Sequence, residues 1–132
     1  MTEKLSEVLR KAHENKTQQT TGYLVRFDSV AKTPTSYCAL GALACNKHHF
    51  KNESDYYAWI KAIEDSRIGI YEQILIEYGV PGELINTNYN LEFDGSLPVV
   101  ANTLPQLIYK LNDQQGFTFE QLADLLETNL GL

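Results

Sequence analysis

The sequence predicts a mainly helical protein: a single-domain helical bundle around a central buried helix at about residues 35–46, with a small β-hairpin or extended element. Apolar residues recur at three- and four-residue intervals over most of the 132 residues. The run ALGALAC is apolar on every face of a helix, which is typical of a helix buried in the middle of its domain. Because the sequence contains no repeat, low-complexity stretch or linker, we expect residues 1–132 to form one globular domain.

The composition is that of a globular protein, with 43% hydrophobic and 21% charged residues. No apolar run approaches the roughly 18 residues that a membrane-spanning helix needs, and the charged, amphipathic start does not resemble a signal peptide. We therefore expect a cytoplasmic protein with no membrane partner. The net charge of −6 makes binding to nucleic acid an unfavoured function, because no excess of cationic side chains is available to displace phosphate counterions.

The first helix is predicted from apolar residues at helical spacing between Leu5 and Ala12, after a start at Thr2 or Ser6. A polar stretch ends this pattern. Residues 23–30 then alternate apolar and polar side chains, which predicts a short strand or an extended segment.

The central helix follows the turn AKTPTS, and we expect its N-cap at Thr35 or Ser36. Its small residues would let neighbouring helices approach closely. Close packing is also the expected compensation for Gly41, since glycine inside a helix costs up to ~1 kcal/mol relative to alanine. Cys38 and Cys45 are seven residues apart, or roughly 10 Å along the helix axis, so we expect two free thiols and no disulfide.

The longest helical pattern covers residues 54–78, and we expect it to divide into two helices near Asp65–Gly69. Gly79, with a proline two residues later, ends the second helix. Residues 88–99 alternate apolar and polar side chains around Asp94-Gly95, a dipeptide typical of tight turns. This stretch predicts the small hairpin.

Two further helices are predicted toward the end of the sequence. The first runs from Leu104 to the NDQQG segment, and the second starts at Thr118 with a capping box. Between them, we expect side-chain oxygens of Asn112 and Asp113 to cap exposed backbone amides, while Gly116 adopts a left-handed conformation. As a functional pair, Asn112 and Asp113 would offer an amide beside a carboxylate.

Cys38 is the candidate nucleophile in an alternative, enzymatic interpretation. A cysteine in the first turn of a helix can carry a stabilised thiolate, as in papain-like and transglutaminase-like enzymes. Such enzymes need a base, and His48 and His49 lie about ten residues along the same helix, roughly 15 Å away. His13 is then the sole candidate base. The alternative to a structural, packed Cys38 is therefore a cysteine-dependent hydrolase or transferase that uses Cys38 and His13.

Metal and cofactor sites are not predicted. Cys45, His48 and His49 have the i, i+3, i+4 spacing of a partial metal site, which would need a further ligand such as His13 or Asp55. Adjacent histidines at the end of a helix are more typical of a solvated terminus. A calcium-like loop, NLEFDGSL, lacks the closing glutamate, and no glycine-rich phosphate loop is present.

Two segments, YCALGALACN and LNDQQGFTFEQLADLLE, resemble a loosely defined family of small uncharacterised proteins of bacteriophages and bacteria. In that family a Cys-x-x-Gly-Ala helix precedes an Asn-Asp turn and a Phe-Glu-x-x-Ala-Asp helix. The resemblance covers the motif regions only and implies no activity. The matching residues here are Cys38, Gly41, Ala42, Asn112, Asp113, Phe119, Glu120, Ala123 and Asp124.

Since no catalytic set is complete, we predict a non-enzymatic binding or regulatory protein. In line with the resemblance, we expect it to be a phage accessory or anti-defence factor. Its partner would be another protein or a second copy. The predicted binding residues are Tyr56, Tyr57 and Trp59, as an aromatic interface, together with Asn112 and Asp113. The alternatives are the cysteine-dependent enzyme described above and a protein that binds a small, nucleotide-like ligand.

Overall fold

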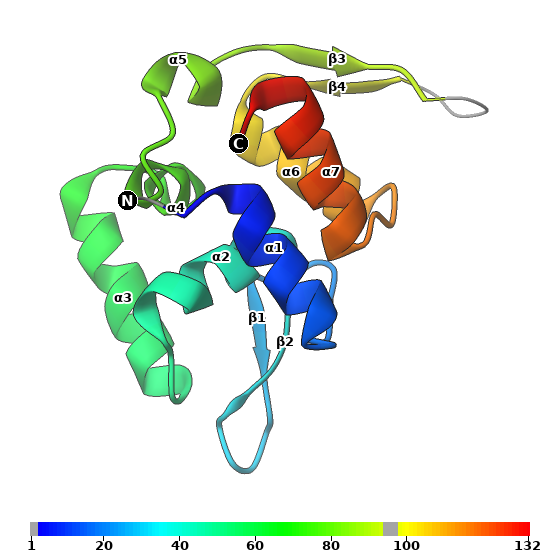
Figure 1. Cartoon of the computed structure of the whole chain (residues 1–132). Helices are drawn as coiled ribbons and strands as arrows, with labels where there is room; N and C mark the ends of the chain where they lie inside the picture. The colour runs from blue at the N-terminus through cyan, green and yellow to red at the C-terminus, as the bar shows by residue number, and fades with distance from the viewer. Residues whose placement is uncertain (1–2, 94–97) are drawn as a thin grey trace.

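The computed structural model describes residues 3–93 and 98–132, which form seven helices and two antiparallel strand pairs (Figure 1). The predicted class, mainly α with a small β element, is confirmed. None of the described helices is long and apolar enough to cross a membrane. The elements in chain order are α1 (Leu5–Glu14), β1 (Val25–Phe27), β2 (Pro34–Tyr37), α2 (Ala39–His48), α3 (Glu53–Ser66), α4 (Ile70–Glu77), α5 (Gly82–Ile85), β3 (Tyr89–Leu91), β4 (Val99–Ala101), α6 (Leu104–Asp113) and α7 (Phe119–Leu130).

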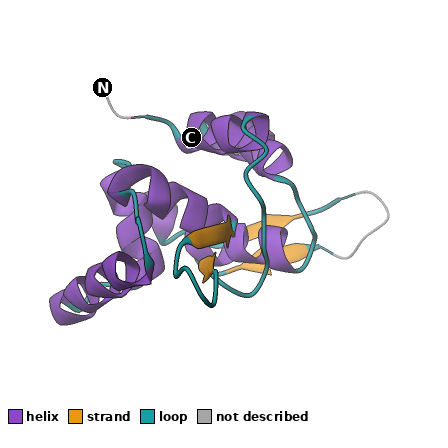
Figure 2. Ribbon diagram, turned by 90° about the horizontal axis from the view of Figure 1, so that it is seen from below, coloured by secondary structure: helices purple, strands orange, loops and turns teal. Residues whose placement is uncertain are grey.

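The central helix α2 begins later than the sequence predicts. The predicted N-cap residues Thr35 and Ser36 lie in β2, which pairs antiparallel with β1 and faces the reader in the view from below (Figure 2). Cys38 is the N-cap, and its Sγ accepts a hydrogen bond from the Gly41 amide at 3.4 Å. The predicted start of the helix is therefore wrong by two to four residues. The backbone N–H and C=O groups of Thr35 and Ser36 lie in a strand pair and are not available to a helix.

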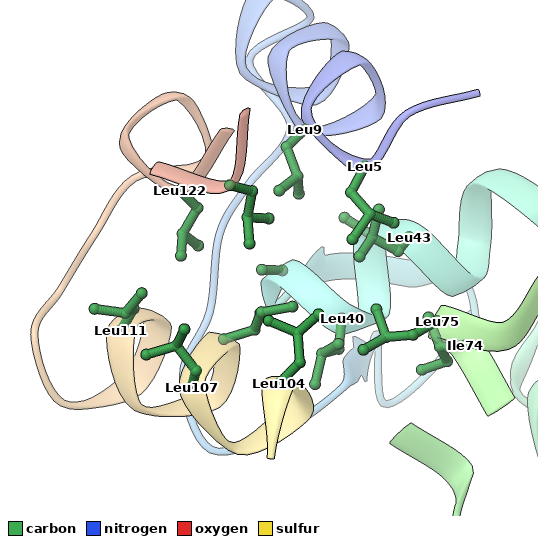
Figure 3. Packing of buried hydrophobic residues seen from close by; sticks show 14 of the residues in the cluster. Leu5, Leu9, Leu40, Leu43, Ile74, Leu75, Leu104, Leu107, Leu111 and Leu122 are labelled. Atoms are coloured by element: carbon green, nitrogen blue, oxygen red, sulfur yellow. The ribbon is translucent and has the colours of Figure 1, made fainter. Parts of the chain in front are cut away.

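The hydrophobic core surrounds the first half of α2, where residues 39–44 are all buried. Figure 3 shows Leu40 and Leu43 of α2 among apolar side chains of α1, α4, α6 and α7. The prediction of a helix buried on all sides is confirmed for this half. The largest fully buried side chains are Leu5, Leu9, Leu43, Ile74, Leu75, Leu104, Leu107, Ile108, Leu111, Phe119, Leu122 and Leu126.

Gly41 permits another segment to approach α2 closely. A Cβ atom on Gly41 would lie 1.7 Å from the carbonyl oxygen of Leu24, the residue before β1. The same oxygen accepts a hydrogen bond from the Cys38 amide at 3.0 Å. Close packing at Gly41 is thus confirmed, but the neighbour is an extended segment where the sequence analysis expected a helix.

The helices α1 and α7 lie side by side, so that the beginning and end of the described chain meet (Figure 1). The amide of Ser6 donates to the carbonyl of Leu132 at 3.1 Å. The Arg10 guanidinium bridges the two helices by binding Asp124 and Glu127, each at 2.9 Å. This ion pair is exposed to solvent, so packing of the apolar faces accounts for most of the stability of the helix pair.

Local sequence signals place several other elements correctly. The pattern over residues 54–78 divides into α3 and α4 as predicted, and β3 pairs antiparallel with β4. The Asp94-Gly95 turn lies outside the described residues. Thr118 and Gln121 form the predicted capping box, in which each side chain accepts a hydrogen bond from the other residue's amide. The short helix α5 was not predicted.

Candidate functional site

A small depression lies where α2 begins, between the segment before β1 and the helices α4 and α6. Its volume is about 30 Å³, close to the share of one water molecule in the liquid, so only the end of a ligand group fits inside. The chemically active side chains that line it are those of Cys38, Asn112, Asp113, Tyr23, Tyr71 and Tyr109. The structure thus brings the candidate nucleophile together with the predicted binding residues Asn112 and Asp113.

A larger depression of about 430 Å³ lies between α4 and α6 and is lined by Tyr71, Glu72, Gln106 and Tyr109, among others. Tyr71 and Tyr109 line both depressions, so the two form one continuous surface. The exposed fractions of these two tyrosines are 48% and 45%, which leaves half of each side chain available to a partner. We call this surface, from Glu72 past Tyr71 and Tyr109 to Asp113, the tyrosine groove.

Asn112 fixes the floor of the tyrosine groove through four hydrogen bonds. Its side chain is buried, and Oδ1 accepts from the Ala39 amide at 3.1 Å and from Gln19 Nε2 at 2.7 Å. Its Nδ2 group donates to the Thr20 carbonyl at 3.0 Å and to Asp113 Oδ1 at 2.6 Å. Asn112 therefore joins the end of α6 to the start of α2 and to the segment before β1.

Asp113 completes the floor by accepting a hydrogen bond from the Gly22 amide on Oδ2 at 2.8 Å. Asn112 and Asp113 do cap backbone amides, but the prediction that these amides lie between α6 and α7 is wrong. The capped amides belong to residues 22 and 39, which only the tertiary fold brings to α6. Gly116 has the predicted left-handed conformation, with φ of +68°. An ionised carboxylate accepts up to about four hydrogen bonds, so Asp113 keeps acceptor capacity for a ligand.

The Cys38 thiol is buried and has no imidazole partner in the described part of the groove. Burial raises the pKa of Cys38 to about 11; the hydrogen bond from Gly41 opposes this rise, while the negative charge of Asp113 adds to it. The candidate base His13 instead pairs with Glu120 of α7 at 3.1 Å. The thiol is consequently protonated at neutral pH, which is unfavourable for a nucleophile.

Thiol labelling tests this protonation state. In a Cys45→Ala variant, where Cys38 is the only thiol, we expect alkylation at pH 7 to be at least about tenfold slower than in the unfolded chain. Because the pKa of Cys38 is raised to about 11, the native rate should climb as the pH approaches 11 and show no plateau near pH 9. Fast, pH-independent labelling near pH 6, followed by mass spectrometry, would instead identify an activated thiolate.

The three predicted aromatic binding residues on α3 have different surroundings. Tyr56 and Trp59 are half-buried and pack on Phe50, with ring centroids 5.4 Å and 5.3 Å from it. Tyr57 packs on Tyr56 at 5.3 Å, but 57% of it is exposed. Of the three side chains, Tyr57 is thus the one most available to a partner.

Tyr57 extends the row of exposed rings beyond the tyrosine groove. It lines a depression of about 300 Å³ together with Tyr23, and Tyr23 also lines the small depression beside Cys38. The exposed rings of Tyr57, Tyr23, Tyr71 and Tyr109 therefore follow one another across the surface, although they come from α3, the segment before β1, α4 and α6. Sequence analysis missed Tyr23, Tyr71 and Tyr109, because no local pattern indicates that residues so far apart share a surface.

The residues of the partial metal motif make separate contacts. Cys45 contacts the Tyr37 hydroxyl, and His48 pairs with Glu77 while stacking on Phe50. Within residues 3–93 and 98–132, no group of three or more His, Cys, Asp or Glu side chains could hold a metal ion.

The geometry thus singles out one surface, the tyrosine groove, with a fixed polar floor, half-exposed aromatic walls and a protonated thiol at its inner end. Comparisons of the chain with protein-family models, with curated proteins and with solved structures find no match.

Proposed function

We propose that this chain is a non-enzymatic binding protein whose tyrosine groove, extended by Tyr23 and Tyr57, receives a protein partner. The observation that carries the proposal is the row of exposed tyrosines from four parts of the fold, which line three depressions that share tyrosines with one another. Tyrosine provides a large contact area at a low cost in conformational entropy and is enriched at protein interfaces. The Asn112 hydrogen bonds support it further, because a fixed floor lowers the entropy lost on binding.

The surroundings of Cys38 favour binding over catalysis. A buried thiol with a pKa of about 11, which no imidazole faces among the residues that the structure describes, lacks the activation that cysteine-dependent hydrolases require. The resemblance to small phage and bacterial proteins adds a biological setting to the proposal: an accessory or anti-defence factor that acts in the cytoplasm on a host component. A small ligand is the second candidate, because 430 Å³ lies within the usual range of ligand pockets.

A selection from a library of displayed random peptides tests the proposed site. We expect peptides enriched on the wild-type protein to lose at least about tenfold in affinity on a Tyr71→Ser, Tyr109→Ser variant, given that aromatic anchors dominate binding energies. A variant with two exposed apolar residues replaced elsewhere, Val30→Ser and Ile76→Ser, should bind the same peptides normally. Thermal unfolding of both variants shows whether each one is folded.

The outcome that contradicts the proposal is equal binding of the selected peptides to the wild type and the groove variant, or no enrichment at all. Small molecules that bind with the same dependence on Tyr71 and Tyr109, in the absence of any enriched peptide, would favour the second candidate.

A further inference from the structure

We infer that the tyrosine groove recognises a cationic side chain, the guanidinium group of an arginine on the partner protein. The inference rests on the proposed function and adds the chemistry of the partner to it. Its basis is the juxtaposition of the carboxylates of Glu72 and Asp113 with the half-exposed rings of Tyr71 and Tyr109.

The lining of the groove carries negative charge on two carboxylates. Glu72 lines the outer depression and Asp113 the inner one, and none of the described residues that line either depression is Lys, Arg or His. Lys110 follows Tyr109 in the chain, but its ammonium group donates to the Val100 carbonyl of β4 at 2.7 Å. The net charge of −6 acts in the same direction, so the field of the whole protein attracts a basic partner.

The walls of the groove suit a cation as well. A cation over the face of a tyrosine ring is stabilised by the quadrupole of the ring. Such contacts occur among the described residues: the Arg26 guanidinium lies 5.3 Å from the ring centre of Tyr23, and the Lys47 ammonium lies 4.7 Å from that of Tyr78. In the described part of the chain, no Lys or Arg is placed over the rings of Tyr71 and Tyr109. A partner can therefore supply the cation there.

The dimensions and acceptors of the groove favour arginine over other basic or anionic ligands. The inner volume of about 30 Å³ holds about one water molecule, so the guanidinium would lie in the outer 430 Å³, beside Tyr71 and Tyr109 and facing the inner depression that Asp113 lines. Asp113 keeps acceptor capacity, and a guanidinium presents five donors in a planar fork that can also stack on tyrosine. A nucleotide would instead bring its phosphate against Glu72 and Asp113 without a cation to balance it.

Titrations followed by NMR of the Tyr71 and Tyr109 ring signals test the inference on the full chain. The probe is a blocked Gly-Arg-Gly peptide, and its neutral control replaces arginine with the near-isosteric citrulline. We expect the arginine peptide to shift both ring signals with saturation and the citrulline peptide to bind at least about tenfold more weakly, because charge carries the recognition. Added salt should weaken the arginine peptide only.

Charge-neutralising variants locate the cation. Glu72→Gln should reduce the affinity for the arginine peptide at least about threefold, since it removes one carboxylate of the groove. Glu83→Gln makes the same charge change on the exposed first turn of α5, outside the residues that line the groove, and should leave the affinity unchanged. Equal binding of the citrulline peptide, equal effects of the two variants, or shifts confined to other residues would each overturn the inference.

The two proposals fail in distinguishable ways. If selected peptides depend on Tyr71 and Tyr109 but contain no excess of arginine, the cation inference is wrong while the binding function stands. If no peptide depends on these tyrosines, the proposed function itself is wrong. Tighter binding of uridine monophosphate than of the arginine peptide would overturn the inference in favour of a nucleotide-like ligand.

Discussion

Replacing Gly41 with alanine is expected to lower the free energy of unfolding by about 3 kcal/mol or more, which is the upper range for overpacked cores. The added Cβ would lie 1.7 Å from the Leu24 carbonyl oxygen, well inside van der Waals contact. The carbonyl cannot simply move away, since it accepts the hydrogen bond of the Cys38 amide that starts α2. The helical preference of alanine over glycine, at most about 1 kcal/mol, does not offset this clash. Denaturant titration of the wild type and the variant measures the difference.

Gly82→Ala is the matched control for this experiment. A Cβ atom at Gly82, the first residue of α5, would point into open space, with no described neighbour outside the local backbone within 4 Å. We expect a change of less than about 1 kcal/mol, because only backbone entropy and helix propensity are altered. Similar losses at Gly41 and Gly82 would mean that the approach of Leu24 to α2 is not tight in solution.

Replacing Asn112 with alanine is the second change with a large expected effect. It removes four hydrogen bonds at once and leaves the Ala39 amide and the Thr20 carbonyl without that partner, while the Gln19 side-chain amide keeps its bond to the Phe117 carbonyl. An unsatisfied buried polar group costs about 1–3 kcal/mol, so we expect a total loss of about 3 kcal/mol, allowing for partial rescue by water. Denaturant titration again gives the free energy of unfolding.

An exposed asparagine provides the comparison for Asn112. Asn88 precedes β3 and is exposed, so Asn88→Ala should change the free energy of unfolding by no more than about 0.5 kcal/mol. A second readout of Asn112→Ala is the alkylation rate of Cys38, which should rise because the start of α2 loses its anchor to α6. If Asn112→Ala behaves like Asn88→Ala in both measurements, the polar floor of the tyrosine groove does not hold the fold together.

The Gly41 and Asn112 variants both test how the segment before β1 is held against α2. Gly41 lets the segment before β1 lie against α2, and Asn112 joins that segment and α2 to the end of α6. The inner depression of the tyrosine groove lies where the three meet, since Tyr23 of the segment, Cys38 at the start of α2 and Tyr109 of α6 all line it. A change that loosens either contact should therefore weaken peptide binding as well as stability.

The sequence by itself determined the features that depend on neighbours along the chain. Helical periodicity predicted α1, α3, α4, α6 and α7, and the alternation over residues 88–99 predicted the β3–β4 pair. The Thr118 capping box and the left-handed Gly116 were correct for the same reason, because the interacting atoms lie within a few residues of each other. The mainly helical class follows from these local signals.

Only the tertiary structure decided where α2 starts, what Asn112 and Asp113 bind, and which tyrosines share a surface. Thr35 and Ser36 were suitable N-caps, but pairing with β1 drew them into a strand and left Cys38 as the cap. Asn112 contacts residues 92 and 93 positions away, at Thr20 and Gln19. Such contacts depend on how separate segments pack around the core, and no spacing within a single segment encodes that packing.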